Sequence, residues 1–237
     1  MRLTQLLLEI LFPSRCVGCG RRGASFCPAC LSAISHVPPN LCFRCGEPGA
    51  NPASGLCARC RRSETALDGG FSVGYSAGAL RQAIHRLKYD GQSRLAEPLA
   101  SLLTDWWAGR RLTVDLIVPV PLHPARQRDR GYNQSALLAR RLAAHTALPC
   151  SEDAVLRCRN TRPQVGLGAA ERWQNVDGAF RAEPTLVAGL RVLLLDDVRT
   201  TGSTLEASAR ALRDAGAATV WALTVARARR DAGHDDT

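Results

Sequence analysis

Two adjacent carboxylates, Asp196 and Asp197, stand at the end of an aliphatic run and just before a turn rich in hydroxyl groups and glycine. The stretch reads VLLLDDVRTTGST from Val192 to Thr204. Like charges at that distance repel each other, so the fold must either compensate the pair or use it. A helix that starts in such a turn offers N–H groups and hydroxyls to an anion, while carboxylates accept hydrogen bonds from sugar hydroxyls and attract Mg²⁺. The stretch therefore predicts a site for a ribose 5-phosphate.

Two other interpretations of the acidic pair explain less of the sequence. An aliphatic strand that ends in two aspartates is also typical of P-loop NTPases, but the chain contains no GxxxxGK[ST] motif. A purely structural strand, turn and helix, with Thr and Ser as helix caps, leaves two carboxylates uncompensated. The ribose 5-phosphate site accounts for the carboxylates and the hydroxyls together.

Eight of the ten cysteines form four C-x-x-C pairs between residues 16 and 60. A tight turn of this spacing brings two thiolates together, and two pairs complete a tetrahedral four-thiolate site. The pattern favours two structural zinc ions over disulfides. Sequential pairing assigns one ion to Cys16, Cys19, Cys27 and Cys30, and the other to Cys42, Cys45, Cys57 and Cys60. A crossed pairing stays open, because only seven residues separate the first two pairs.

The net charge of +10 hints at a polyanionic partner, and its distribution is uneven. Residues 1–65 contain eight Arg and three Glu, a net charge of +5, and Lys88 is the only lysine of the chain. The arginines around the cysteine pairs either engage phosphates or solvate a small module, and the sequence leaves both open. They are Arg21, Arg22, Arg44, Arg59, Arg61 and Arg62.

Neither a membrane span nor a signal peptide is expected from the sequence. No segment approaches the ~20 apolar residues of a membrane span. The start, MRLTQLLLEILFPSRC, has a short apolar stretch interrupted by Glu9 and no small-residue cleavage site. It indicates a brief amphipathic helix from Leu3 to Phe12 rather than a signal peptide. A cytoplasmic protein is expected.

A different pattern begins after Thr65, where apolar runs of strand length alternate with segments of helical periodicity. Strands are expected at residues 71–76, 115–121, around Val155, 176–180, 189–197 and 219–225. Helices are expected at residues 79–89, 95–107, 133–147 and 203–215, with a polar loop after residue 121. This alternation predicts an α/β fold with a mainly parallel sheet flanked by helices, in which ligands bind beyond the carboxyl ends of the strands. The expected domains are a zinc module, residues 1–65, and an α/β domain, residues 66–237.

Several stretches of the chain resemble known families. VLLLDDVRTTGST resembles the phosphoribosyl-diphosphate (PRPP) signature of type I phosphoribosyltransferases. Arg199 departs from that signature, which usually has an uncharged residue there; it either adds a phosphate contact or points to solvent. The four cysteine pairs, LKYDG, VPVPLHPARQRDRGYNQS and RCRNTRPQVGLGAAERWQNVDGAF follow one another as in the ComF family of competence-associated proteins, which the chain resembles over nearly its whole length. The resemblance implies a type I phosphoribosyltransferase-like sheet with an N-terminal zinc-ribbon-type module.

The resemblance also implies roles for individual residues. Asp196 and Asp197 are the expected catalytic residues, which hold the 2′- and 3′-hydroxyls of PRPP together with Mg²⁺. The 5-phosphate is expected to bind Thr200, Thr201, Gly202, Ser203 and Thr204. Candidates for contacts with the pyrophosphate are Lys88, Arg126, Arg128, Arg130, Asn133, Arg162 and Gln164.

Two functions follow from the resemblance. The first is a phosphoribosyltransferase, a glycosyltransferase that displaces pyrophosphate from PRPP in favour of an acceptor that the sequence does not identify. The second is a non-catalytic competence protein that binds single-stranded DNA and keeps the PRPP pocket as a ligand or regulatory site, with proteins of the machinery for DNA uptake in natural transformation as partners. Phe26 and Phe43 are the only aromatic residues between the zinc-ligand cysteines, so base stacking gives the second function little support. The oligomeric state is not predicted.

Overall fold

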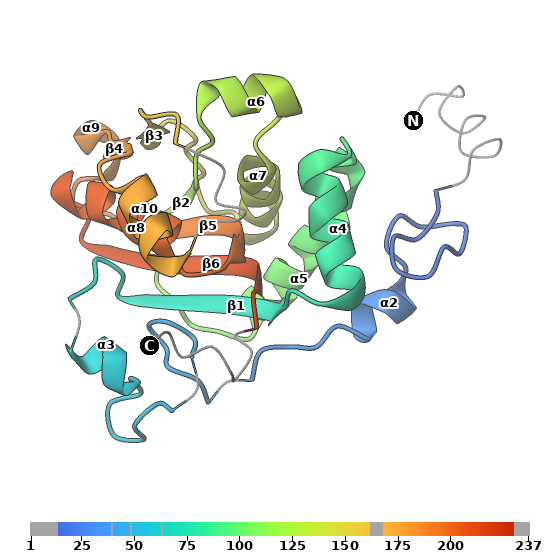
Figure 1. Ribbon diagram of the computed structural model, residues 1–237, viewed down its shortest axis with the longest axis horizontal. Coiled ribbons are helices and arrows are strands. Elements are labelled where there is room, and N and C mark those ends of the chain that lie inside the picture. The colour runs from blue at the N-terminus through green and yellow to red at the C-terminus, as the bar shows by residue number, and fades with distance from the viewer. Residues whose placement is uncertain (1–13, 39, 48, 63, 162–167, 230–237) are drawn as a thin grey trace.

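The computed structural model describes residues 14–38, 40–47, 49–62, 64–161 and 168–229 (Figure 1). The amphipathic helix expected at residues 3–12 lies outside these residues. Four parallel strands form the central sheet in the order β1-β6-β5-β2. They are β1 (Gly69–Tyr75), β2 (Leu116–Pro119), β5 (Arg191–Arg199) and β6 (Thr219–Arg227). The expected α/β fold with a mainly parallel sheet is confirmed.

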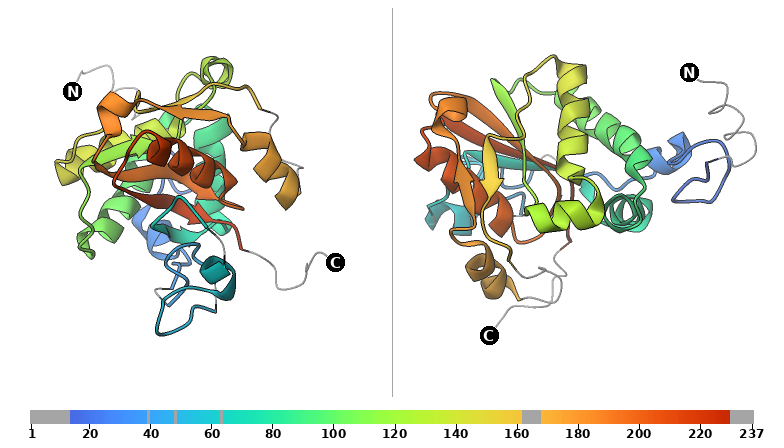
Figure 2. Two further views of the ribbon diagram at one scale, coloured as in Figure 1. Left: turned by 90° about the vertical axis from the view of Figure 1, so that its left-hand side faces the viewer. Right: turned by 90° about the horizontal axis from the view of Figure 1, so that it is seen from above.

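Both faces of the sheet are covered. Alternate side chains of β5 point to opposite faces, so this strand contributes to two cores. Leu193 and Leu195 pack in one core with three helices, while Val192 and Leu194 pack in a second core with one helix and a small antiparallel pair of strands. The first group is α4 (Gly78–Tyr89), α5 (Ala96–Ala108) and α7 (Gln134–Thr146). The second group is α10 (Ser203–Asp214), β3 (Val155–Arg157) and β4 (Phe180–Ala182). In the right-hand view of Figure 2, the green to yellow-green helices of the first group lie on the opposite side from α10 and β4, which are orange to red.

Three short helices depart from the sequence-based expectation: α6 (Pro124–Arg130), α8 (Ala169–Val176) and α9 (Pro184–Val187). The polar loop expected after residue 121 contains α6, which begins at Pro124 and is capped by His123. No residue of α6 is buried, so no apolar periodicity indicated this helix. The strand expected at residues 176–180 was also wrong in its position, because Val176 ends α8 and β4 begins only at Phe180.

The cysteine-rich segment forms two separate ribbons. The first ribbon runs from Cys16 to Ser32 and includes α2 (Pro28–Ser32); the second runs from Cys42 to Arg62 and includes α3 (Ala58–Arg62). The first ribbon packs so closely on α4 that a Cβ added to Gly18 would lie 2.7 Å from Cβ of Ala79. The second ribbon lies beside β1, where the N–H of Gly70 donates to the carbonyl of Phe43 at 2.7 Å. Figure 1 shows α2 and α3 at opposite ends of β1.

A search of the described helices found none with the length and apolar character that a bilayer crossing requires.

Candidate functional site

The acidic pair lies toward the carboxyl end of β5, where Asp196 is 8% and Asp197 1% exposed. Residues from two helices compensate the pair. Lys88 of α4 places its Nζ 3.0 Å from Asp197 Oδ1. Ser135 of α7 donates its hydroxyl to Asp196 Oδ1 at 2.7 Å. The repulsion between the two carboxylates is therefore countered within the chain itself, by an ammonium and a hydroxyl.

The protonation of this cluster follows from its burial. Burial and the neighbouring Asp197 raise the pKa of Asp196 to about 7, although Lys88 and two hydrogen bonds oppose the shift. Burial disfavours the charged form of Lys88, but the two carboxylates outweigh it and raise the pKa of Lys88. Asp197 Oδ2 is buried and has no hydrogen-bond partner in the described part of the chain. The cluster thus keeps one buried acceptor oxygen for a hydroxyl donor or a hard cation such as Mg²⁺.

A cavity of about 260 Å³ opens beside the acidic pair, and the turn between β5 and α10 forms part of its wall. Gly202 in this turn has φ +84°, a left-handed conformation that favours glycine, and α10 begins at the next residue. Four of the five residues expected to bind a phosphate line the cavity: Thr200, Gly202, Ser203 and Thr204. The fifth, Thr201, lines an adjacent cavity instead. The N-terminus of a twelve-residue helix, with its partial positive charge, therefore lies at the cavity.

Arginines form another wall of the same cavity. Arg126 and Arg130 come from α6, Arg157 from β3 and Arg172 from α8. Arg157 is 8% exposed; burial and the nearby Arg126 lower its pKa to about 10, so its guanidinium remains charged at neutral pH. Its Nε is buried without a hydrogen-bond partner among the described residues. Such a set of fixed donors suits a ligand with several anionic oxygens.

Other residues expected from the sequence lie elsewhere. Asn133 caps α7: its Oδ1 accepts from the N–H of Ser135 at 3.0 Å, and its Nδ2 donates to the carbonyl of Val120 at 3.0 Å. Arg128 does not line the cavity, whereas Lys88 does. Arg162 and Gln164 lie outside the described residues. The cavity therefore brings together the acidic pair, most of the hydroxyl-rich turn, Lys88 and two arginines of α6.

Sequence reasoning missed several residues of the site. Ser135 and Gln134 begin α7, and Tyr89 ends α4. Arg157 ends β3, for which a strand was expected around Val155, whereas Arg172 lies in α8, which was not expected. All but Ser135 line the cavity. Gln134 and Ser135 stand at the end of VPVPLHPARQRDRGYNQS, and Arg157 opens RCRNTR, so the quoted stretches contained them without indicating which side chains reach the cavity.

The side chain of Arg199 is buried, and the sequence did not predict its partner. It is only 9% exposed, so the expectation that it points to solvent is wrong. Its Nη1 donates to the carbonyl of Arg44 in the second ribbon at 3.2 Å. Arg199 therefore lies between the cavity and the second ribbon, and it lines cavities on both sides of the turn.

The cysteines form two groups with sequential pairing. Within each group, the four Sγ atoms lie within 4.8 Å of one another. The Sγ atoms of Cys19 and Cys27 are 3.7 Å apart, and those of Cys45 and Cys57 are 3.6 Å apart. A tetrahedron of sulfurs around Zn²⁺ at ~2.3 Å has edges of about 3.8 Å, so both groups fit zinc. All four cysteines of the second ribbon are buried, whereas Cys19 of the first is exposed.

Two family models match different parts of the chain. A family model described as a double zinc ribbon domain matches residues 7–61, and one described as a phosphoribosyl transferase domain matches residues 135–237. DNA utilization protein YhgH of Salmonella typhimurium is 37% identical over 204 residues, which are 83% of this chain and 88% of that protein. Competence protein F of Haemophilus influenzae is 33% identical over 230 residues, 92% of this chain and 98% of that protein. Competence protein ComFC of Bacillus subtilis is 27% identical over 211 residues, 85% of this chain and 83% of that protein.

Among solved structures, the chain is similar to a glutamine PRPP amidotransferase from B. subtilis, with a TM-score of 0.37 and 23% identity over 56% of this chain and 26% of that one. It is also similar to an adenine phosphoribosyltransferase from Leishmania donovani, with a TM-score of 0.37 and 12% identity over 63% of this chain and 75% of that one.

Proposed function

We propose that this chain, which belongs to the ComF family of competence-associated proteins, is a phosphoribosyltransferase that binds PRPP with Mg²⁺ beside Asp196 and Asp197. The observation that carries the proposal is the meeting of three kinds of group at one cavity: an acidic pair, a helix N-terminus with hydroxyls, and several arginines. A ribose diol donates hydrogen bonds to carboxylates, whereas a 5-phosphate and a diphosphate accept them from N–H groups and guanidiniums. PRPP carries a ribose diol, a 5-phosphate and a diphosphate, so one molecule can bind all three kinds of group.

Asp196 and Asp197 are the residues that would hold the ribose hydroxyls and Mg²⁺. Their Oδ1 atoms already accept hydrogen bonds from the chain: Asp196 Oδ1 from Ser135, and Asp197 Oδ1 from the N–H of Val198 at 2.7 Å. Asp197 Oδ2 is the buried oxygen that lacks a partner in the described chain. A ligand that binds there adds an interaction without breaking these bonds.

In the proposed reaction, an acceptor nucleophile forms a bond to C1 of the ribose as the bond from C1 to the diphosphate oxygen breaks. The diphosphate leaves with the bonding electrons, and the acceptor releases its proton to solvent. Positive charge develops on the ribose ring, while Arg126, Arg130 and Arg157 stabilise the departing anion. Bound Mg²⁺ supplies further positive charge to the diphosphate. The chain acts by positioning and charge, so a covalent protein nucleophile is not required.

Calorimetry of PRPP binding in the presence of Mg²⁺ tests the proposal. We expect micromolar binding to the wild type and its loss in the double variant Asp196→Asn/Asp197→Asn. Asp153→Asn, which removes an exposed carboxylate away from the cavity, serves as the matched control. An assay for pyrophosphate release with nucleobases, amines and ammonia then identifies the acceptor. Wild-type protein that neither binds PRPP nor releases pyrophosphate with any acceptor would rule out the proposed function.

The names of the relatives support a second role, in the uptake or use of DNA. We propose that exposed arginines of the ribbons bind single-stranded DNA: Arg21 and Arg22 of the first ribbon, and Arg61 and Arg62 of the second. Arg44 is engaged within the chain, because its Nη1 donates to the carbonyl of Cys60 at 3.0 Å. Phe26 is only 4% exposed, which leaves little aromatic surface for base stacking in the first ribbon. Phe43 of the second ribbon is 36% exposed and is the one ribbon aromatic within the described residues that a base could reach, so binding would depend mainly on phosphate contacts.

Titration of a single-stranded oligonucleotide at several salt concentrations tests this role. Each phosphate contact contributes about −0.7 to the slope of log affinity against log salt concentration. The variant Arg61→Ala/Arg62→Ala is therefore expected to bind more weakly and to show a slope smaller in magnitude by about 1.4. Arg181→Ala removes an exposed arginine of β4 and is the matched control. An unchanged affinity and slope in the double variant would contradict DNA binding by the second ribbon.

A further inference from the structure

Two buried arginines connect the central sheet to the second ribbon. Arg199 ends β5 and Arg227 ends β6, and the two residues are paired in the sheet register. Arg199 donates from Nη1 to the carbonyl of Arg44 at 3.2 Å, and Arg227 from Nη1 to the carbonyl of Cys45 at 3.3 Å. Arg227 also bonds the carbonyl of Gly46 and a carboxylate oxygen of Glu47. Both guanidiniums thus bind the C-x-x-C turn that supplies the first two ligands of the second zinc site.

The charge of Arg199 requires a counter-charge, because buried cations are costly unless paired. Arg227 has Glu47 as its partner. No carboxylate forms an ion pair with Arg199 among the residues described. Cys45 and Cys60 line the same cavity of about 310 Å³ as Arg199. Four thiolates around Zn²⁺ carry a net negative charge, so the second zinc centre, together with the carboxylate of Glu47, supplies the negative charge near Arg199.

The same arginine packs against the turn proposed to bind the 5-phosphate. A Cβ added to Gly202 would lie 3.1 Å from Arg199 Nε, and one added to Gly70 would collide with Arg199 Nη1. The side chain therefore passes between the turn and β1 in a space that glycine leaves open at both positions. Thr201 and Gly202 of the turn also line the cavity that Cys45 and Cys60 share. A displacement of the second ribbon would thus be transmitted to the turn through Arg199.

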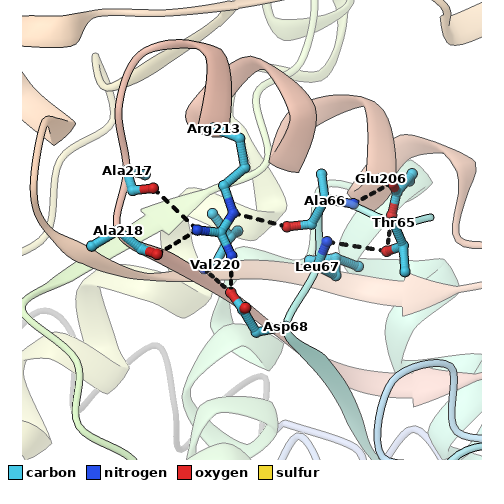
Figure 3. Close-up of polar contacts among 9 residues, drawn as sticks. All are labelled: Thr65, Ala66, Leu67, Asp68, Glu206, Arg213, Ala217, Ala218 and Val220. Carbon is cyan, nitrogen blue, oxygen red and sulfur yellow. Dashed lines mark hydrogen bonds and ion pairs between the residues drawn. The ribbon is translucent and has the colours of Figure 1, made fainter.

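The chain that leaves the second ribbon is bound to α10, the helix that follows this turn (Figure 3). Glu206 in the first turn of α10 accepts hydrogen bonds from the hydroxyl of Thr65 at 2.7 Å and from the N–H of Ala66 at 2.6 Å. Arg213 near the end of α10 donates to the carbonyl of Ala66 at 3.2 Å and bonds the carboxylate of Asp68. The second ribbon is therefore attached to the ends of β5 and β6 at its first C-x-x-C pair, and the chain that leaves it is attached to α10.

We propose that zinc in the second ribbon and the phosphate ester in the cavity are thermodynamically coupled, with Arg199 as the positioning residue that links them. The proposal rests on the proposed function, since PRPP is the ligand concerned. The first ribbon packs against the start of α4, at Ala79, and makes none of the bonds described above, so we expect no coupling of its zinc to the ligand. Coupling of this kind is reciprocal: if zinc favours PRPP binding, PRPP favours zinc binding by the same factor.

The test uses the full zinc-loaded chain, with PRPP and Mg²⁺ as the probe. A zinc-selective chelator that leaves Mg²⁺ bound is titrated with and without PRPP. Cysteines that lose zinc are alkylated and identified by mass spectrometry, so each sample reports on the two ribbons separately. We expect PRPP to raise the chelator concentration that strips the second ribbon about fivefold or more, and to leave that of the first ribbon unchanged.

Variants of Arg199 test the link itself. Arg199→Gln is expected to weaken PRPP binding and to abolish the protection that PRPP gives the second zinc against the chelator. Arg199→Lys, which keeps the charge, is expected to retain part of this protection. The exposed Arg181→Ala changes neither quantity. The wild-type titration remains decisive if an Arg199 variant does not fold.

The outcomes separate the two proposals. Wild-type protein that binds PRPP but loses zinc from the second ribbon equally easily with and without it overturns the coupling and leaves the proposed function standing. Equal protection of both ribbons also overturns it, because that result indicates a general stabilisation of the chain. Wild-type protein that does not bind PRPP by calorimetry overturns the proposed function, and the coupling falls with it.

Discussion

Replacement of Asp196 by Asn should stabilise the folded chain at neutral and alkaline pH, even though it removes a residue of the proposed site. Burial and Asp197 raise the pKa of Asp196 to about 7 in the folded chain, whereas an unperturbed aspartate titrates near ~3.9. Between these values the folded state binds more protons than the unfolded state, so its stability falls as the pH rises from about 4 to about 7. Above about pH 7, the difference in pKa lowers the free energy of unfolding by roughly 4 kcal/mol at most, relative to its value below about pH 4.

Asparagine retains an oxygen that can accept the hydroxyl of Ser135 but carries no charge into the buried site. We expect Asp196→Asn to exceed the wild type in free energy of unfolding by about 2 to 4 kcal/mol near pH 8.5, and this advantage to be smaller by roughly 2 kcal/mol near pH 5.5. Urea denaturation of both proteins across this range measures the difference. All variants carry the same zinc ribbons, so zinc loss at low pH cancels in the comparison, and Asp153→Asn shows the effect of an exposed carboxylate.

This reasoning would be refuted if the difference in free energy of unfolding between Asp196→Asn and the wild type did not change between about pH 5.5 and pH 8.5. Asp196 would then be charged and fully compensated in the folded chain, and the cluster would contain enough positive charge without a ligand. A difference that disappears when PRPP and Mg²⁺ are added would instead support the proposed role, because a ligand that binds the charged form offsets the cost of burying it.

Two further substitutions test the geometry of the site. Gly202→Ala is expected to destabilise the chain by about 1 to 2 kcal/mol and to weaken PRPP binding, because Gly202 has φ +84° and an added Cβ would meet Arg199. Gly178→Ala, at φ +61° with open space around it, is the matched control for the backbone conformation alone, and urea denaturation of both variants separates the two costs. Ser135→Ala removes the hydroxyl donor from a buried carboxylate; it should cost about 1 to 3 kcal/mol near pH 8.5 and raise the pKa of Asp196, measured by NMR titration. An unchanged pKa in that variant would contradict the assigned hydrogen bond.

The parts of the structure that the sequence predicted well are those determined by local pattern. The run from Val192 to Leu195 is buried on both faces, as expected of a central parallel strand, and it is the clearest element in sequence and structure alike. The C-x-x-C pairs likewise form the two expected groups, because a thiolate pair is created by a single turn. Position within the chain was sufficient to place the acidic pair and the hydroxyl-rich turn next to each other.

The partners of the acidic pair could not be predicted in this way. Lys88 was expected among the phosphate contacts, but its ammonium lies against Asp197, and the hydroxyl of Ser135 reaches Asp196 from α7. Both contacts depend on how α4 and α7 pack against β5, which no short-range pattern encodes. Arg199 is a similar case, because the direction of its side chain depends on the second ribbon, where its partner Arg44 lies 155 residues earlier in the chain. Long-range packing, rather than residue type, assigned these side chains their roles.

Lys88 is expected to act as the counter-ion of the acidic pair rather than as a phosphate ligand, because it binds Asp197 Oδ1 and leaves Oδ2 to the ligand. Its charge also lowers the pKa of Asp196, so Lys88→Met should raise that pKa further above about 7. Since the charged carboxylate is the form that accepts hydroxyls and Mg²⁺, PRPP affinity should increase as the pH rises through the pKa of Asp196, and the midpoint should move to higher pH in Lys88→Met. Calorimetry between about pH 6 and pH 9 distinguishes the two roles. A uniform loss of affinity at every pH, with no shift of the midpoint, would identify Lys88 as a phosphate ligand instead.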